Sequence, residues 1–167
     1  QVQTDFQVAE EDVVLQLDVI GDEATLYAWR PSEKMPDEPQ VSLTLPAVQV
    51  GAIGAGMNRS DPDASVIFRY LWFASEPFRD EGIALYDDFK DGDYEFPPVA
   101  WALTAQGPAT MSAESGDLVV TPSDSFNALW VEPVGPDYAL QDASVRSQIR
   151  LTGAGQRVWL WSQARLN

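Results

Sequence analysis

Apolar and polar residues alternate along several short segments of the chain, which is the pattern of half-buried β-strands. The clearest case is Val13–Ile20, where every second residue is apolar and Gln16 and Asp18 lie on the opposite side. Gly21-Asp-Glu follows as a turn signal, and Ala24–Arg30 continues as a second strand. The period of two therefore predicts a β-hairpin near the start of the chain.

The same alternation marks the last part of the chain. In Val145–Leu151 the residues on one side are mostly apolar, and they alternate with Arg146, Gln148 and Arg150. After a glycine-rich turn, Val158–Trp161 resumes as an extended segment. Its two tryptophans can each bury roughly 150–250 Å², enough to anchor a sheet. We predict that these two strands form a terminal β-hairpin.

Other short strands are predicted between connections rich in Pro and Gly. The most apolar is Ser65–Phe73, which we expect to be a central strand covered on both sides or lying at an interface. Gly51–Asn58 is rich in glycine but has the wrong spacing for a dinucleotide site, so we predict a flexible loop. Tyr138–Ala143 is the one place where a helical turn is expected. The remaining predicted strands are Val41–Leu45, Ala47–Val50, Ile83–Tyr86, Val99–Thr104, Ala109–Ser112, Asp117–Thr121 and Phe126–Glu132.

About ten to twelve short strands without an amphipathic helix predict an all-β fold, an antiparallel β-sandwich or barrel. The length of 167 residues suits one domain spanning residues 1–167. The first residue is Gln1 rather than Met. We expect a domain excised or processed from a longer chain, with a start trimmed for expression as the alternative.

The chain contains no cysteine and no histidine. This excludes disulfides, thiolate catalysis, Ser-His-Asp triads and metal sites built on His or Cys. The motifs of P-loop enzymes, α/β-hydrolases and zinc proteases are also missing from the sequence. Carboxylates alone could support glycoside hydrolysis, but most glycosidase folds are larger. We therefore predict that the chain is not an enzyme.

The chain is strongly acidic, with 26 acidic and 10 basic residues and a formal net charge of −16. All acidic residues lie at or before Asp142, and four arginines follow it. A surface of this charge repels phosphate backbones, so we expect no nucleic-acid partner for this segment. The sequence has no apolar run long enough to span a bilayer, and we expect no membrane insertion.

Two tryptophans near the end of the chain are candidates for a binding surface. Trp159 and Trp161 share one side of their predicted strand, and they face outward if their apolar neighbours turn inward. An exposed aromatic pair of this kind forms an association surface or a ligand platform. The candidate residues of this face are Trp159, Trp161, Arg146 and Arg150.

A second candidate is the acidic segment Asp87–Glu95. It does not match an EF-hand, because Phe89 and Pro98 stand where oxygen ligands are needed. Asp91-Gly-Asp93 is better explained as a turn. A calcium site stays open because oxygen ligands need no histidine, and no other cofactor is predicted. The candidate ligands are Asp87, Asp88, Asp91 and Asp93.

The chain resembles the projecting, or protruding, surface domains of small icosahedral virus capsid proteins. The resemblance lies in a cysteine-free, helix-poor and acidic β-domain, with Ser65–Phe73 and Val145–Gln163 as its most definite parts. It implies self-association as a dimer or trimer, attachment to a host receptor or glycan, a location on the virion surface or outside the cell, and no catalysis. We expect the loops Pro31–Pro39, Gly51–Asp63 and Asp87–Pro98 to form the contact rim. The alternatives are a carbohydrate-binding module of a secreted protein and a bacteriophage tail or decoration protein.

Overall fold

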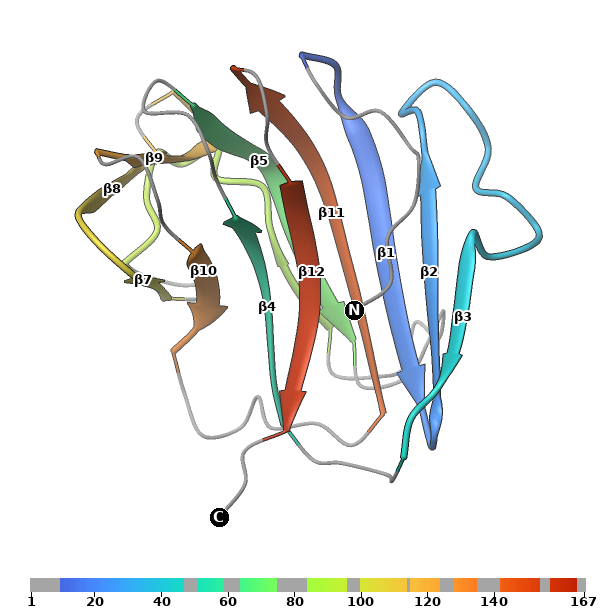
Figure 1. The fold of residues 1–167 in the computed structure, drawn as a ribbon. Helices are drawn as coiled ribbons and strands as arrows, with labels where there is room; N and C mark the ends of the chain where they lie inside the picture. The colour runs from blue at the N-terminus through green and yellow to red at the C-terminus, as the bar shows by residue number, and fades with distance from the viewer. Residues whose placement is uncertain are drawn as a thin grey trace.

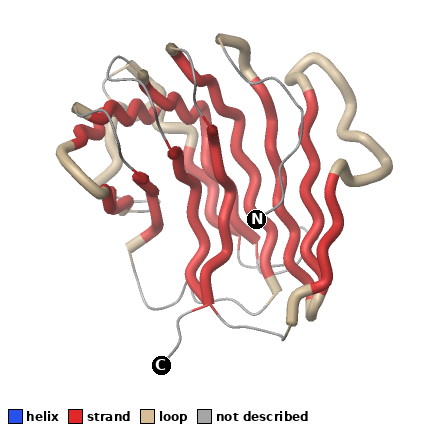
Figure 2. The backbone as a smooth tube through the Cα atoms, viewed as in Figure 1, coloured by secondary structure: helices blue, strands red, loops and turns tan. Residues whose placement is uncertain are grey.

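The computed structural model describes residues 10–46, 51–58, 64–74, 84–95, 100–113, 115–123, 128–134, 142–153 and 157–164. Figure 2 shows strands and loops in this part of the chain and no helix, which confirms the all-β prediction. None of the described residues belongs to a helix that could cross a membrane. The strands are β1 (Val13–Ile20), β2 (Glu23–Trp29), β3 (Val41–Thr44), β4 (Gly51–Asn58), β5 (Ser65–Ala74), β6 (Ala84–Asp87), β7 (Trp101–Ala105), β8 (Ala109–Ser112), β9 (Leu118–Pro122), β10 (Ala128–Pro133), β11 (Ala143–Thr152) and β12 (Arg157–Ala164).

The strands form two antiparallel sheets. The large sheet has eight strands: seven follow the order β3-β2-β1-β11-β5-β9-β8, and β6 pairs with β5 beside this path. The small sheet has four strands in the order β12-β4-β10-β7. In Figure 1 the small sheet lies in front of the large one, and β2 and β3 extend beyond it on the right. The arrangement is a two-layer β-sandwich.

The core lies between the two sheets. The large sheet contributes alternate residues of β1, β5, β9 and β11, among them Phe68, Phe73 and Ile149. The small sheet contributes Ala55, Val131 and other residues. Because side chains alternate across a strand, these buried positions also identify the residues that lie on the outer face of each sheet.

The first predicted hairpin is confirmed. β1 and β2 pair in register from Val14 opposite Trp29 to Ile20 opposite Glu23. The turn contains Gly21, whose φ of 59° lies in the left-handed region that glycine adopts at little cost. A short local turn and clean alternation were sufficient to specify this pairing.

The predicted terminal hairpin is wrong. β11 pairs with β1 on one side and with β5 on the other, so both of its hydrogen-bonding edges are occupied within the large sheet. β12 belongs to the small sheet and pairs with β4. A strand has only two edges, and β12 therefore has to find its partner in the other layer.

The prediction of a flexible loop at Gly51–Asn58 is also wrong. These residues form β4, which pairs with β12 and with β10 in the middle of the small sheet. Glycine disfavours strands because it has no side chain to pack, but pairing on both edges overrides that preference here.

β5 contains an irregularity that the sequence pattern did not indicate. The pairing with β11 shifts between Gln148 and Ile149, so that Arg69 is the extra residue between Phe68 and Tyr70. The buried residues of β5 accordingly change from even to odd positions. A β-bulge of this kind re-aims side chains, and it keeps Arg69 out of the core.

The structure describes only part of the predicted contact rim, and the clustering of its loops at one end stays a prediction. Gly51–Asn58 is the strand β4, and residues 59–63 and 96–98 lie outside the described residues. Pro31–Pro39 connects β2 to the edge strand β3, whereas Gly92 of the acidic loop lies beside Ala113, next to β8 at the other edge of the large sheet. Most of the predicted helical turn and all of the predicted strand Ala47–Val50 lie outside the described residues.

Candidate functional site

The outer face of the large sheet gathers aromatic and charged side chains. Along β11, Val145 and Ile149 lie in the core, so Arg146 and Arg150 lie on the face that turns away from the small sheet. Both arginines are partly buried on that face. Residues of β1 and β5, which pair with β11, and of β2 and β6, which pair with β1 and β5, complete the face.

Arg146 lies at the centre of a row of residues that crosses five strands. It pairs with Gln16 of β1 on one side and with Trp72 of β5 on the other. Beyond them, Tyr27 of β2 is opposite Gln16 and Tyr86 of β6 is opposite Trp72. Residues directly opposite each other in a sheet have adjacent side chains, so this row is continuous.

The guanidinium of Arg146 contacts two indole rings. Its central carbon is 5.1 Å from the ring centroid of Trp72 and 5.7 Å from that of Trp29. Both distances lie within the range of cation–π attraction. We call this surface the aromatic–arginine face; it comprises Trp29, Tyr70, Trp72, Tyr86 and Arg146.

Two tyrosines extend the aromatic–arginine face toward solvent. The rings of Tyr70 and Tyr86 are 5.8 Å apart and tilted by 33°. Burial raises the pKa of the Tyr70 phenol. Tyr86 is 50% exposed, which makes it one of the most exposed large apolar side chains among the described residues. The face therefore has a partly buried centre and an accessible aromatic rim.

A buried polar chain lies beneath Arg146. The Nε of Arg146 donates to Oε1 of Gln16 over 2.7 Å, and Nε2 of Gln16 donates to both carboxylate oxygens of Asp18 over 2.9 and 3.0 Å. The hydroxyl of Ser144 also donates to Asp18. Gln16, Asp18 and Ser144 are all buried. Burial raises the pKa of Asp18 above its ordinary value, although these hydrogen bonds and the charge of Arg146 act against the shift.

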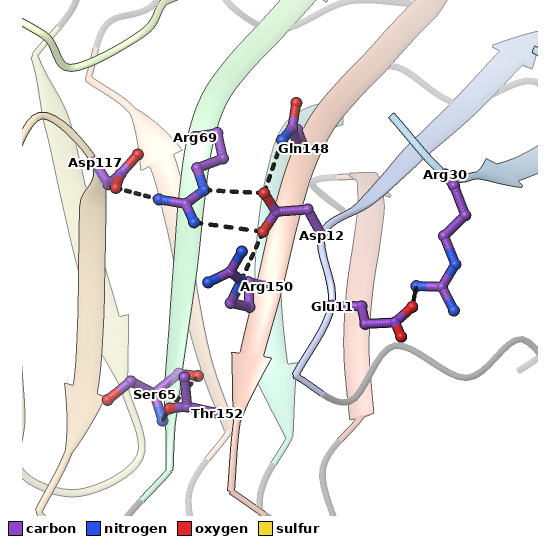
Figure 3. Close-up of polar contacts among 9 residues, drawn as sticks. All are labelled: Glu11, Asp12, Arg30, Ser65, Arg69, Asp117, Gln148, Arg150 and Thr152. Atoms are coloured by element: carbon purple, nitrogen blue, oxygen red, sulfur yellow. Dashed lines mark hydrogen bonds and ion pairs between the residues drawn. The ribbon is translucent and has the colours of Figure 1, made fainter. Parts of the chain in front are cut away.

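Arg150 belongs to a separate ion-pair cluster at the other end of the same face (Figure 3). The carboxylate of Asp12 accepts hydrogen bonds from Nε of Arg150 over 2.8 Å and from Gln148 over 3.1 Å. Nε of the bulge residue Arg69 lies 3.4 Å from Asp12, and the same guanidinium pairs with Asp117. Two arginines and two aspartates thus compensate each other's charge.

Burial alone would raise the pKa of Asp12, but its neighbours reverse the shift. The hydrogen bonds from Arg150 and Gln148, together with the charge and the hydrogen bond of Arg69, lower the pKa of Asp12 below its ordinary value. The cluster is a structural cross-link between β11, β5 and the residues that precede β1 and β9.

The structure does not bring the four predicted face residues together. Arg146 and Arg150 lie on β11 of the large sheet, whereas Trp159 and Trp161 lie on β12, the edge strand of the small sheet. In the register of the small sheet, Trp159 is opposite Gly56 and Trp161 is opposite Gly54. The four residues therefore lie in two different sheets.

The acidic loop does not present its carboxylates as one ligand set. Asp87 is buried and accepts from the backbone amide of Phe89 over 2.9 Å and from Nε1 of Trp101 over 2.7 Å. Asp88 pairs with Lys90. Asp91 and Asp93 accept from backbone amides of residues 93 and 95. The calcium site stays a prediction, and an ion would have to replace these contacts.

Phe89 shows what the loop does in the fold. Its φ is 55°, a conformation that costs energy for a residue with a side chain, yet its ring is fully buried against Trp101. The two hydrogen bonds to Asp87 hold both aromatic residues in place. Burial raises the pKa of Asp87, although these hydrogen bonds act against the shift.

Comparisons with known proteins do not add a family. No model of a protein family matches the chain, and no curated protein sequence matches it significantly. Across the described ranges, no group of three or more Asp, Glu, His or Cys residues is placed to hold a metal ion. The side-chain geometry is thus the basis for a functional proposal.

Sequence reasoning missed most of the aromatic–arginine face. Arg146 was recognised from its outward position, but Trp29, Tyr70, Trp72 and Tyr86 were not assigned to the same surface. Trp29 on β2 and Tyr86 on β6 could have been assigned to this face, because their outward positions follow from strand alternation. The positions of Tyr70 and Trp72 depend on the bulge at Arg69, which alternation does not reveal.

Proposed function

We propose that this domain is a non-enzymatic recognition and association domain of the kind that projects from the surface of virus capsids, and that the aromatic–arginine face is its association surface. The observation that carries this proposal is the stacking of Arg146 on Trp29 and Trp72, with the half-exposed Tyr86 at the rim. Arginine, tryptophan and tyrosine are the residues that most often dominate the energy of protein interfaces.

The central side chains of the aromatic–arginine face are already held in place before a partner binds. Arg146 is held by two rings and by Gln16, so little conformational entropy remains to be lost when a partner covers it. Gln16 and Asp18 are already buried and hydrogen-bonded, so contact would not strip water from them. Both features lower the cost of forming an interface.

A non-catalytic role is supported by the hydrogen bonds and ion pairs that three carboxylates of the fold already make. Asp18 and Asp87 accept two or more hydrogen bonds each, and Asp12 is enclosed by two arginines. Carboxylates that are engaged in this way act as structural acceptors.

Sedimentation velocity of the domain and two charge-insertion variants tests association. Tyr86→Glu places a carboxylate on the aromatic–arginine face, whereas Leu43→Glu changes a residue of similar exposure, 43% against 50%, on the other face of the large sheet. We expect concentration-dependent dimers or trimers for the wild type and for Leu43→Glu, and monomers for Tyr86→Glu. A monomeric wild type at all concentrations, or equal behaviour of the two variants, would contradict the proposal.

The capsid assignment has its own test. The complete reading frame that encodes this domain is expressed and examined by sedimentation and negative-stain microscopy. We expect uniform closed shells with projections. If only small soluble species form while the isolated domain still self-associates, the association face stands and the capsid assignment fails, which leaves a carbohydrate-binding module or a phage tail or decoration protein as alternatives.

A further inference from the structure

The edge strand β3 directs part of its backbone away from the large sheet. β3 ends the strand order of this sheet and pairs only with β2 in the part of the chain that the structure describes (Figure 1). The amide of Leu45 donates to the carbonyl oxygen of Asp22 over 2.6 Å, so Leu45 and, by alternation, Leu43 turn their backbone groups toward β2. The N–H and C=O groups of Ser42 and Thr44 therefore point away from β2.

The adjoining edge of β2, by contrast, is closed by a side chain. Beyond the end of β3, Oε1 of Gln40 accepts from the N–H of Ala28 over 2.7 Å, and Nε2 of Gln40 donates to the C=O of Ala28 over 2.9 Å. Charged side chains often protect an exposed edge in the same way, but β3 contains no charged residue. Pro39 and Pro46 flank it and limit an added strand to the four residues of β3.

One side of β3 continues an apolar surface. Val41 is opposite Leu26, and Leu26 is opposite Leu17 of β1. Leu17 lies on the same side of β1 as the core residue Leu15, and alternation places Leu43 on this side as well. β2 and β3 extend beyond the small sheet (Figure 1), and Leu43 is 43% exposed while Val41 is partly exposed. Every second residue of an added strand would cover these apolar side chains.

The turn and the loop beside β3 carry an excess of acidic side chains. The two basic residues of this region each pair with an acid, Arg30 with Glu11 over 2.8 Å and Lys34 with Asp37 over 3.7 Å. Two copies of the chain that paired through β3 would bring these like charges together, so the edge favours a basic segment of another molecule. The exposed acidic residues beside β3 are Asp22, Glu23, Glu33, Asp37 and Glu38.

We propose that β3 is a docking edge for an extended segment of another protein, in which apolar residues alternate with lysine or arginine. The backbone of the segment pairs with Ser42 and Thr44, and its apolar residues lie beside Val41 and Leu43. Its basic residues lie on the other side of the sheet, where Glu23 is opposite Thr44. This edge is separate from the aromatic–arginine face, so the inference does not depend on self-association or on the capsid assignment.

A peptide of alternating lysine and valine, blocked at both ends, is the probe for this edge. Calorimetry measures its binding to the domain, and NMR of the isotope-labelled domain follows hydrogen exchange at the amides of Ser42 and Thr44. One control peptide has the same composition with its lysines and valines in separate blocks, and another has glutamate in place of lysine. We expect the alternating lysine peptide to bind saturably and to protect both amides, and each control to bind at least about tenfold more weakly.

Two variants of β3 test the backbone and the apolar contacts separately. Ser42→Pro removes an N–H that points away from β2, and Ser42→Ala is the matched control because it removes only the hydroxyl. Leu43→Lys keeps the backbone but removes an apolar contact and repels a basic segment. We expect Ser42→Pro and Leu43→Lys each to weaken binding by about tenfold or more, and Ser42→Ala and Tyr86→Glu to bind like the wild type. Thermal unfolding verifies that each variant is folded.

Several outcomes would overturn the proposal. The alternating lysine peptide would fail to bind, would bind without protecting Ser42 and Thr44, or would bind no better than the glutamate peptide. Wild-type binding by Leu43→Lys or by folded Ser42→Pro would also overturn it. So would protection of the two amides in the free domain. Protection that is independent of protein concentration would mean that a segment of the same chain covers the edge, and protection that rises with concentration would mean that a second copy does.

Discussion

Asp12 and Asp18 lie on the same outer face at opposite ends of β1, and their surroundings are opposite in character. Asp12 contacts Arg150 and Arg69, and its pKa is lowered. Asp18 is buried more deeply among neutral donors, and its pKa is raised. The same residue type therefore forms an ion-pair cross-link at one end and a dehydrated polar chain at the other. Only the second end adjoins the aromatic–arginine face.

The largest effect in this comparison is expected from Gln16→Leu. The substitution keeps the volume nearly unchanged but removes both hydrogen bonds from Gln16 to Asp18 and the acceptor for Nε of Arg146. Removing hydrogen-bond partners from buried polar groups lowers the free energy of unfolding by about 2–4 kcal/mol, although Asp18 keeps the hydrogen bond from Ser144. Urea unfolding measures the loss.

The double variant Gln16→Leu/Asp18→Leu is the control for this reasoning. It removes the carboxylate that the single variant leaves without Gln16, so we expect it to recover part of the lost stability. If Gln16→Leu is as stable as the wild type, the polar chain does not support this end of the face.

A smaller effect is expected at the Asp12 end. Asp12→Asn removes the charge that faces two arginines, and it lowers the free energy of unfolding by about 1–2 kcal/mol because the site is partly solvated. The neighbouring Glu11 provides a matched control, since it pairs with Arg30 over 2.8 Å but its side chain is 67% exposed (Figure 3). Glu11→Gln should change stability by less than about 0.5 kcal/mol. Equal losses for both variants would contradict a structural cross-link at Asp12 that is stronger than an exposed ion pair.

The opposite pKa shifts predict opposite dependences on pH. Because the pKa of Asp12 is lowered in the fold, its stabilising contribution is present above 3.8 and is lost as the pH falls through the folded value. Because the pKa of Asp18 is raised, the folded protein binds the proton more tightly, and its contribution falls as the pH rises from 3.8 through the folded value.

Unfolding curves recorded from pH 2 to 7 test both signs. Relative to Asp12→Asn, the wild type should lose stability toward acid pH, and relative to Asp18→Asn, the wild type should lose stability as the pH rises toward neutral. If the stabilities of the wild type and Asp18→Asn change with pH in parallel, burial does not raise the pKa of the Asp18 carboxyl in the folded protein.

Local patterns in the sequence predicted most of the strands. The alternation in Val13–Ile20 and Val145–Leu151 is a property of neighbouring residues, and both segments are strands with the expected core side. The β1–β2 pairing was also predictable, because a two-strand unit joined by a short turn is specified by its own residues. The outward positions of Arg146 and Arg150 follow from the same alternation.

The partners of strands distant in the chain could not be predicted in this way. Backbone edges are chemically alike, so the sequence of β12 does not reveal that β11 is fully paired and that β4 offers a free edge. The glycines of β4 argued for a loop when considered alone. They form a strand because β10 and β12 pair with β4 along both of its edges.

The sequence by itself determined most of the strands, the acidic charge and the absence of cysteine and histidine chemistry, since these depend on composition and on neighbouring residues. Only the tertiary structure decided that Trp29 and Trp72 contact Arg146, that β12 pairs with β4, and that Asp12 meets two arginines. Each of these contacts joins residues far apart in the chain. Their meeting depends on strand register, and register is set when the two sheets bury their apolar faces together.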